Sequence, residues 1–170
     1  MKKTNQRISS RNTSRNQVPA LHRALVQDGW LESGQCNLDV GGGRFDAATN
    51  WMHRLGISNS VYDPYNRGKL HNDRVMNRSD YDTATVANVL NVIAEKDARL
   101  DVLRAAKTRA GVVFISVYEG DRSGVGRVTR DGWQEHRKIE DYLTEVREVF
   151  PGATIQRVAK TKVIFSQLEV

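Results

Sequence analysis

The sequence has 170 residues, 39% of them hydrophobic and 27% charged, which is typical of a single globular domain and excludes a disordered or collagen-like chain. Its single cysteine excludes an intramolecular disulfide framework, and no apolar run approaches the roughly 18 residues of a membrane helix. The basic N-terminus lacks the apolar segment of a secretory signal, so we expect a cytoplasmic protein without membrane contact.

The net charge of +6 is concentrated at the N-terminus. Residues 1–17 hold five basic side chains and no acidic one, so residues 18–170 have a net charge of only +1. The first segment is polar and shows no hydrophobic period, which predicts a basic, flexible tail over 1–17 and one domain over 18–170. Such a tail either attaches the protein to nucleic acid or serves as a solubilising extension.

The hydrophobic pattern predicts helices and strands that alternate along the domain. A helix over 18–31 comes first, then a strand over 36–40, a helix from 45 to 55 that ends at Gly56, and a second strand that starts at Val61. Residues 66–80 are polar and give no assignment, so a third strand there stays open. The later predicted elements are a strand within 83–92, an amphipathic helix over 95–109, a strand over 112–118, a glycine-rich loop over 120–126, a helix over 138–149, and two closing strands over 153–159 and 162–168.

Strands separated by helical segments favour a parallel sheet with right-handed crossovers. A closing hairpin adds antiparallel strands at one edge of that sheet. The sequence therefore predicts an α/β fold with a mostly parallel sheet, flanking helices and an antiparallel C-terminal hairpin.

Three glycines, Gly41–Gly43, follow the first predicted strand and precede a helix. Glycine in such a loop lets the backbone approach a ligand closely, because no Cβ intervenes. Asp39 stands just before the glycines, and a second carboxylate, Asp63, ends the next strand at about the spacing of a grip on ribose hydroxyls. A triple glycine alone is equally typical of a tight strand–helix turn, but the three features together favour a nucleotide-like ligand.

Residues 38–46 resemble the first motif of class I S-adenosylmethionine-dependent methyltransferases, an acidic residue followed by spaced glycines. Residues 61–64 are similar to the second motif of that family, and residues 81–93 to its fourth strand and the segment after that strand. The resemblance covers roughly residues 18–168 and implies a Rossmann-like fold, S-adenosylmethionine as cofactor, and methyl transfer as the activity. The dinucleotide fingerprint of dehydrogenases fits less well, because Asp46 stands where its third glycine belongs.

The resemblance also implies which residues bind the cofactor. Gly41 and Gly43 would lie against its methionine part, and Asp39 would help to orient its amino group. The other implied residues are Asp63 for the ribose hydroxyls, Pro64 near the adenine, and Asn88 beside the transferred methyl. Residues 88–93 and 124–134 further resemble methyltransferase-like proteins associated with DNA phosphorothioation systems, which implies a nucleic-acid context.

A second basic stretch, residues 122–138, holds four arginines and Lys138 around a tryptophan. An aromatic ring among arginines can stack a base while the cations hold phosphate, or the same stretch can be a surface loop whose tryptophan folds onto the core. We predict substrate binding at Arg127, Arg130 and Trp133. DNA or RNA is then the expected acceptor, with a small molecule as the alternative.

The catalytic residues are left open by the sequence. Residues 88–91 lack the two prolines and the aromatic of the DNA amino-methyltransferase signature, and Cys36 begins a strand too far from the predicted site to attack cytosine C5. His136 and Glu119 are the candidates for a general base, and no spacing resembles a metal site. A catalytically silent module that binds S-adenosylmethionine or a partner remains the alternative function, followed by a dehydrogenase-like nucleotide binder. The sequence does not indicate the oligomeric state.

Overall fold

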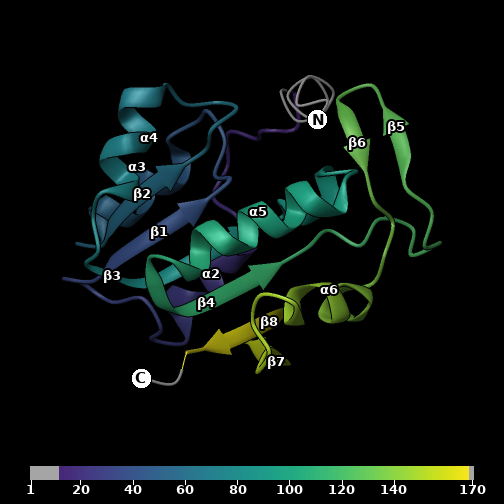
Figure 1. Cartoon of the computed structure of the whole chain (residues 1–170). Helices are drawn as coiled ribbons and strands as arrows, with labels where there is room; N and C mark the ends of the chain where they lie inside the picture. Colours follow the sequence, from purple (N-terminus) through teal and green to yellow (C-terminus); the bar gives the residue numbers. More distant parts are fainter. Residues whose placement is uncertain (1–11, 169–170) are drawn as a thin grey trace.

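The computed structural model describes residues 12–168 and is built around one six-stranded sheet (Figure 1). The strand order is β2–β1–β3–β4–β8–β7; the first four strands are parallel, and β8 and β7 each run antiparallel to the neighbour before them. The strands are β1 (Cys36–Val40), β2 (Ser58–Tyr62), β3 (Tyr81–Ala87), β4 (Ala110–Ser116), β7 (Thr154–Val158) and β8 (Thr161–Gln167). The predicted mostly parallel α/β sheet with a closing hairpin is confirmed.

Helices cover both faces of the sheet, and each face has its own hydrophobic core. The core on one face receives side chains from α4, α5 and α6, with α5 in front of the strands in Figure 1, and the core on the other face receives them from α2 and α3. The helices are α2 (Ala20–Gln27), α3 (Ala47–Arg54), α4 (Lys69–Met76), α5 (Lys96–Lys107), α6 (Leu143–Arg147) and the short 3₁₀ segments η1 (Leu90–Val92) and η2 (Ile139–Tyr142).

Three segments add to the sequence prediction or differ from it. Residues 66–80, which the sequence left open, contain α4 and no strand, so β2 is the edge of the sheet. The helix predicted over 18–31 is α2, which is shorter than predicted. The predicted loop after β4 leads into a separate two-stranded sheet of β5 (Arg127–Thr129) and β6 (Gly132–Gln134), which extends away from the main sheet in Figure 1.

The register of the parallel strands determines where a ligand can bind. β1 pairs with β2 on one side and with β3 on the other, with Val40 opposite Tyr62 and Asp39 opposite Thr85. The three strands therefore end at the same edge, and the loops after them are neighbours in space. Across residues 12–168, no helix has the length and apolar character needed to cross a bilayer.

Candidate functional site: a pocket at the carboxyl edge of the sheet

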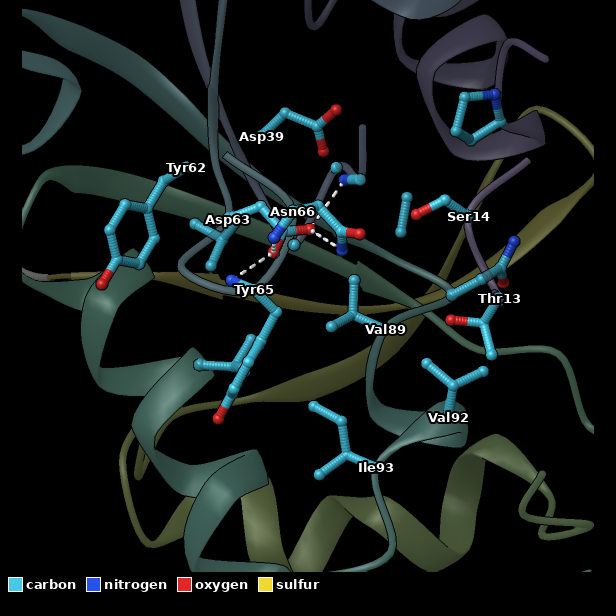
Figure 2. A pocket seen from close by; sticks show the side chains of 18 of the residues that line it. Thr13, Ser14, Asp39, Tyr62, Asp63, Tyr65, Asn66, Val89, Val92 and Ile93 are labelled. Atoms are coloured by element: carbon cyan, nitrogen blue, oxygen red, sulfur yellow. Dashed lines mark hydrogen bonds between the residues drawn. The ribbon is translucent and has the colours of Figure 1, made fainter. Parts of the chain in front are cut away.

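A pocket lies at the edge where β1, β2 and β3 end (Figure 2). The loops after these strands form one part of its wall, and η1, α5 and residues 13–19 form the rest. All six residues predicted to bind a cofactor line this pocket: Asp39, Gly41, Gly43, Asp63, Pro64 and Asn88.

The glycine turn after β1 has a conformation that side chains would not permit. Gly41 and Gly43 have φ angles of 76° and 80°, in the region that L-residues with a Cβ rarely adopt. A Cβ at Gly41 would lie 2.7 Å from the methyl groups of Val89, and a Cβ at Gly42 would lie 2.6 Å from Asp39 Oδ2. The turn thus brings bare backbone to the pocket, as the sequence predicted.

Asp39 is buried behind this turn. Its side chain is 2% exposed, and its Oδ1 lies 3.3 Å from the hydroxyl of Thr85 and 3.5 Å from Nε2 of His22. Among the described residues, its Oδ2 has no hydrogen-bond partner. Because an ionised carboxylate is costly to bury without a partner, this oxygen is suited to accept a hydrogen bond from a cationic ligand.

Asp63 connects the loop after β2 to the glycine turn. Its Oδ2 accepts hydrogen bonds from the backbone N–H of Gly43 (2.9 Å) and from the amide of Asn66 (3.0 Å). Its Oδ1 accepts from the backbone N–H groups of Tyr65 and Asn66, both at 3.0 Å. A carboxylate has about four acceptor sites, so the protein's own donors fill the Asp63 carboxylate, which the sequence predicted to bind the ribose hydroxyls.

The opposite wall of the pocket is apolar and partly aromatic. Figure 2 shows Val89, Val92 and Ile93 on the side of the cavity facing Tyr65. Burial, together with nearby carboxylates, raises the pKa of both Tyr62 and Tyr65 above its ordinary value. Both phenols therefore remain protonated at neutral pH and can donate hydrogen bonds. This wall can hold a flat heterocyclic ring.

Comparisons with known proteins give matches to solved structures. No protein-family model matches the chain, and no curated protein matches it in sequence. The chain is similar to an S-adenosylmethionine-dependent methyltransferase from Aquifex aeolicus, with a TM-score of 0.54 and 14% identity over 89% of this chain and 91% of that one. It is also similar to a TehB-like S-adenosylmethionine-dependent methyltransferase from Corynebacterium glutamicum, with a TM-score of 0.51 and 15% identity over 88% of each chain.

A third similar structure belongs to a larger protein. It is phosphoethanolamine N-methyltransferase 2 of Haemonchus contortus with bound S-adenosylhomocysteine, with a TM-score of 0.51 and 15% identity over 82% of this chain and 39% of that one. The fold is that of class I S-adenosylmethionine-dependent methyltransferases. The predicted Rossmann-like fold is thereby confirmed. These structures give no support to the narrower resemblance to proteins of DNA phosphorothioation systems.

In this methyltransferase fold, residues 13–19 form an N-terminal strap that borders the pocket. Ser14 packs against Gly43, where an added Cβ would lie 2.7 Å from its hydroxyl oxygen. Arg15 donates a hydrogen bond to Asp131, in the turn between β5 and β6, at 3.1 Å. The prediction of a flexible tail over 1–17 did not include this contact, because nothing in a polar segment without periodicity indicates where it packs. Residues 1–11 of the predicted tail lie outside the described residues.

The two candidates for a general base do not line the pocket of the methyltransferase fold. The Nδ1 atom of His136 accepts a hydrogen bond from the backbone N–H of Asp121 at 3.0 Å, so its lone pair is in use. Glu119 accepts from the backbone N–H of Ile139 at 2.9 Å and pairs with Arg122 at 2.6 Å. Both side chains hold the segment after β4 in place, and the geometry gives no support for catalysis by either.

The predicted substrate-binding residues lie on the β5–β6 hairpin, outside the pocket. Arg127 pairs with Asp121 at 3.1 Å. The ring of Trp133 is half-buried and lies against Gly126, and its indole nitrogen is buried without a hydrogen-bond partner among the described residues. Arg130 keeps 93% of its side chain exposed.

Two further sequence predictions concern chemistry that the pocket would not use. Cys36 is the first residue of β1, at the end of the sheet opposite the pocket, which confirms that it is too distant to act as a nucleophile there. Within residues 12–168 no cluster of histidine, cysteine and acidic side chains has the arrangement of a metal site.

Proposed function

We propose that this chain binds S-adenosylmethionine in the pocket and transfers its methyl group to an acceptor. The pocket itself is the observation that supports this most directly. It combines a glycine turn that excludes side chains, a buried carboxylate with one free oxygen, and an apolar wall. These features fit an amino acid with a cationic amino group joined to an aromatic base.

The chain's own residues would bind and orient this cofactor. Asp39 Oδ2 would accept a hydrogen bond from the ammonium group, and the backbone of Gly41 and Gly43 would lie beside the methionine part. The apolar wall around Val89 and Val92 would hold the adenine. S-adenosylmethionine, when bound, supplies a methyl group activated by a sulfonium, so the protein contributes mainly by positioning the reactants and excluding water.

The role of Asp63 differs from the one that the family resemblance implies. Three of its four hydrogen bonds come from backbone N–H groups, and the fourth comes from the side chain of Asn66. The side-chain donor is the one that can move without disturbing the loop. We propose that a ribose hydroxyl takes the place of the Asn66 amide on Asp63 Oδ2.

We propose a nucleic acid as the acceptor, on the basis of charge beside the pocket. Arg15, which lines the pocket, and Arg130 both contact the single carboxylate of Asp131, at 3.1 and 3.4 Å. Two cations that share one anion leave a net positive charge where the strap meets the hairpin. The segment after β4 as a whole adds little net charge, because residues 119–138 hold five basic and four acidic side chains.

The binding step can be tested by filling the pocket from α5. Ala98 lines the pocket, and Ala105 lies two turns further along the same face without reaching it. Both are half-buried, so Ala98→Phe and Ala105→Phe form a matched pair. We expect Ala98→Phe to weaken S-adenosylhomocysteine binding at least about tenfold in calorimetric titration, a difference of about 1.4 kcal/mol. Ala105→Phe should bind as the unaltered protein does, and no binding by the unaltered protein contradicts the proposal.

The transfer step is tested with S-adenosylmethionine that carries a labelled methyl group. RNA, DNA and a small-metabolite fraction are the three acceptor pools, and Arg130→Ala is the variant. We expect label in nucleic acid and a smaller dependence on salt concentration in Arg130→Ala, because that variant has one phosphate contact fewer. Label only in the metabolite fraction contradicts a nucleic acid acceptor. Cofactor binding without any transfer supports the catalytically silent alternative.

A further inference from the structure

We infer that His22 and Thr85 are positioning residues, which hold Asp39 with its free oxygen toward the amino group of the cofactor. This inference rests on the proposed function. It concerns a polar group of side chains behind the glycine turn, between α2 and the centre of the sheet. None of these residues except Asp39 was singled out for binding by the sequence.

His22 is completely buried at the interface between α2 and β3, where the other buried residues of α2 are apolar. Its Nε2 lies 2.9 Å from the hydroxyl oxygen of Thr85 and 3.5 Å from Asp39 Oδ1. Its Nδ1 is buried and has no hydrogen-bond partner among the described residues. An unpaired buried nitrogen destabilises a fold, so a purely structural core position would favour an aliphatic side chain.

The direction of the hydrogen bonds follows from Asn37, whose amide has fixed partners. Its oxygen accepts from the hydroxyl of Thr83 at 2.8 Å, so its nitrogen is the group that donates to Asn59 at 2.8 Å and to Thr85 at 2.9 Å. The Thr85 oxygen thus already accepts one hydrogen bond.

The Thr85 hydroxyl has one proton, and the two nearest acceptors for it are His22 Nε2 at 2.9 Å and Asp39 Oδ1 at 3.3 Å. Because Nε2 also lies 3.5 Å from Asp39 Oδ1, we assign the ring proton to Nε2, where an N–H and not a lone pair faces the carboxylate. Nε2 then donates to the second lone pair of the Thr85 oxygen. The order of donation is therefore from His22 to Thr85 and from Thr85 to Asp39. This chain of hydrogen bonds holds one oxygen of the carboxylate.

The other oxygen of Asp39 is the one that faces the ligand side. Oδ2 lies against Gly42, where an added Cβ would be only 2.6 Å away, and it receives no hydrogen bond from the described residues. The carboxylate is thus held at Oδ1 and open at Oδ2, next to the turn that would carry the methionine part. A carboxylate held in this way is already oriented for an ammonium group and loses less entropy on binding.

The test compares two ligands that differ only at the amino acid end. S-adenosylhomocysteine carries the ammonium group, whereas 5′-methylthioadenosine has the same adenosine part without it. Thr85→Val and His22→Leu should weaken S-adenosylhomocysteine about tenfold and change 5′-methylthioadenosine less than about twofold. Thr85→Ser and His22→Gln, which retain a hydroxyl and a donor, should restore most of the lost affinity.

A double-mutant cycle with Asp39→Asn separates an effect of His22 on the position of Asp39 from a general loss of stability. If His22 acts through Asp39, then His22→Leu should have little further effect on S-adenosylhomocysteine binding in the Asp39→Asn background. Equal weakening of both ligands, or additive effects in the cycle, would overturn the inference while leaving the proposed function intact. Failure of the unaltered protein to bind either ligand would contradict both.

Discussion

Asp63 shows how one side chain organises the wall of the pocket. Its carboxylate joins the backbone of Gly43 to the loop after β2, and Arg67 adds a second connection by donating to the carbonyl of Gly43 at 2.8 Å. The glycine turn therefore depends on the loop after the neighbouring strand for its shape. A change at Asp63 affects the whole wall and not only one contact with a ligand.

We predict that Asp63→Asn destabilises the protein. The new amide nitrogen would face N–H groups that donate to the carboxylate now, leaving buried donors unpaired, which costs about 1–3 kcal/mol. Asp73→Asn is the control, because Asp73 is half-exposed and, among the described residues, its side chain pairs only with Lys69 on the surface of α4. We expect a change within about 0.5 kcal/mol for it in urea unfolding. Equal stability of both variants would contradict this role of Asp63.

Residues of the pocket could be predicted from the sequence where a local motif contains them. Asp39, Gly41, Gly43 and Asn88 are recognisable because each lies at the end of a strand, where the fold places binding residues. The sequence could not show that the protein's own donors fill the Asp63 carboxylate, or that His22 is buried, since both depend on segments far apart in the sequence. The position of His136 outside the pocket was not predictable either, because it depends on the hairpin after β4.

At the scale of elements, Arg99 joins four segments at the base of the β5–β6 hairpin. Its guanidinium makes two hydrogen bonds to Glu145 of α6, at 2.7 and 2.9 Å, and donates to the carbonyls of Ile93 and Ala94. It also lies 3.8 Å from Glu135, the residue immediately after β6. All three charged side chains are buried, so the hairpin is anchored by a cation between two carboxylates.

We predict that Arg99→Met lowers the free energy of unfolding by about 3 kcal/mol, because it leaves the two buried carboxylates with only the longer contacts to Arg137, at 3.6 and 4.0 Å. Arg104→Met, on the exposed side of α5, removes only a surface pair with Asp101 and should cost less than about 1 kcal/mol. The double variant Arg99→Met, Glu145→Met should recover part of the loss. Urea unfolding measures all three, and a single Arg99→Met variant as stable as Arg104→Met would contradict the anchoring role.

The elements that sequence patterns identified are those with a strong hydrophobic period. α5, β4 and the closing hairpin lie close to their predicted positions because their buried side chains follow a helix or strand period. α4 escaped prediction because Asn72 and Val75 are its only buried side chains. The β5–β6 hairpin escaped because its strands have three residues each, too few for a period, although Asp131-Gly132 at its turn is a typical hairpin signal.

At the scale of the whole molecule, the core behind the sheet is built from both ends of the described chain. Leu21 and Leu25 of α2 pack in one cluster with Val158 and Val163 of the closing hairpin. The ring of Trp30 contacts Phe114 and Phe165, with centroids 5.1 and 5.6 Å away. The side chain of Asp28 accepts a hydrogen bond from a backbone N–H 131 residues away in the sequence. Within residues 12–168, the fold is closed by contacts between the earliest and the latest elements.

We predict that Leu25→Ala destabilises the entire domain and not α2 alone. Truncation of this fully buried side chain should cost about 2–5 kcal/mol, and tryptophan fluorescence and circular dichroism should report the same shifted transition. Val26→Ala, one position along α2 and half-buried, is the control, with a smaller loss expected. Two separate transitions in Leu25→Ala would show that α2 unfolds independently of the closing hairpin.

The contact between α2 and the closing hairpin has a consequence for the protein's synthesis. The ribosome makes α2 early, whereas β7 and β8 emerge only after more than a hundred further residues. Until then, the apolar side of α2 lacks part of its native cover and is exposed to other chains or to chaperones. A nascent chain stalled before β7 would keep this surface uncovered, so we expect the native state to form only once the last two strands have left the ribosome.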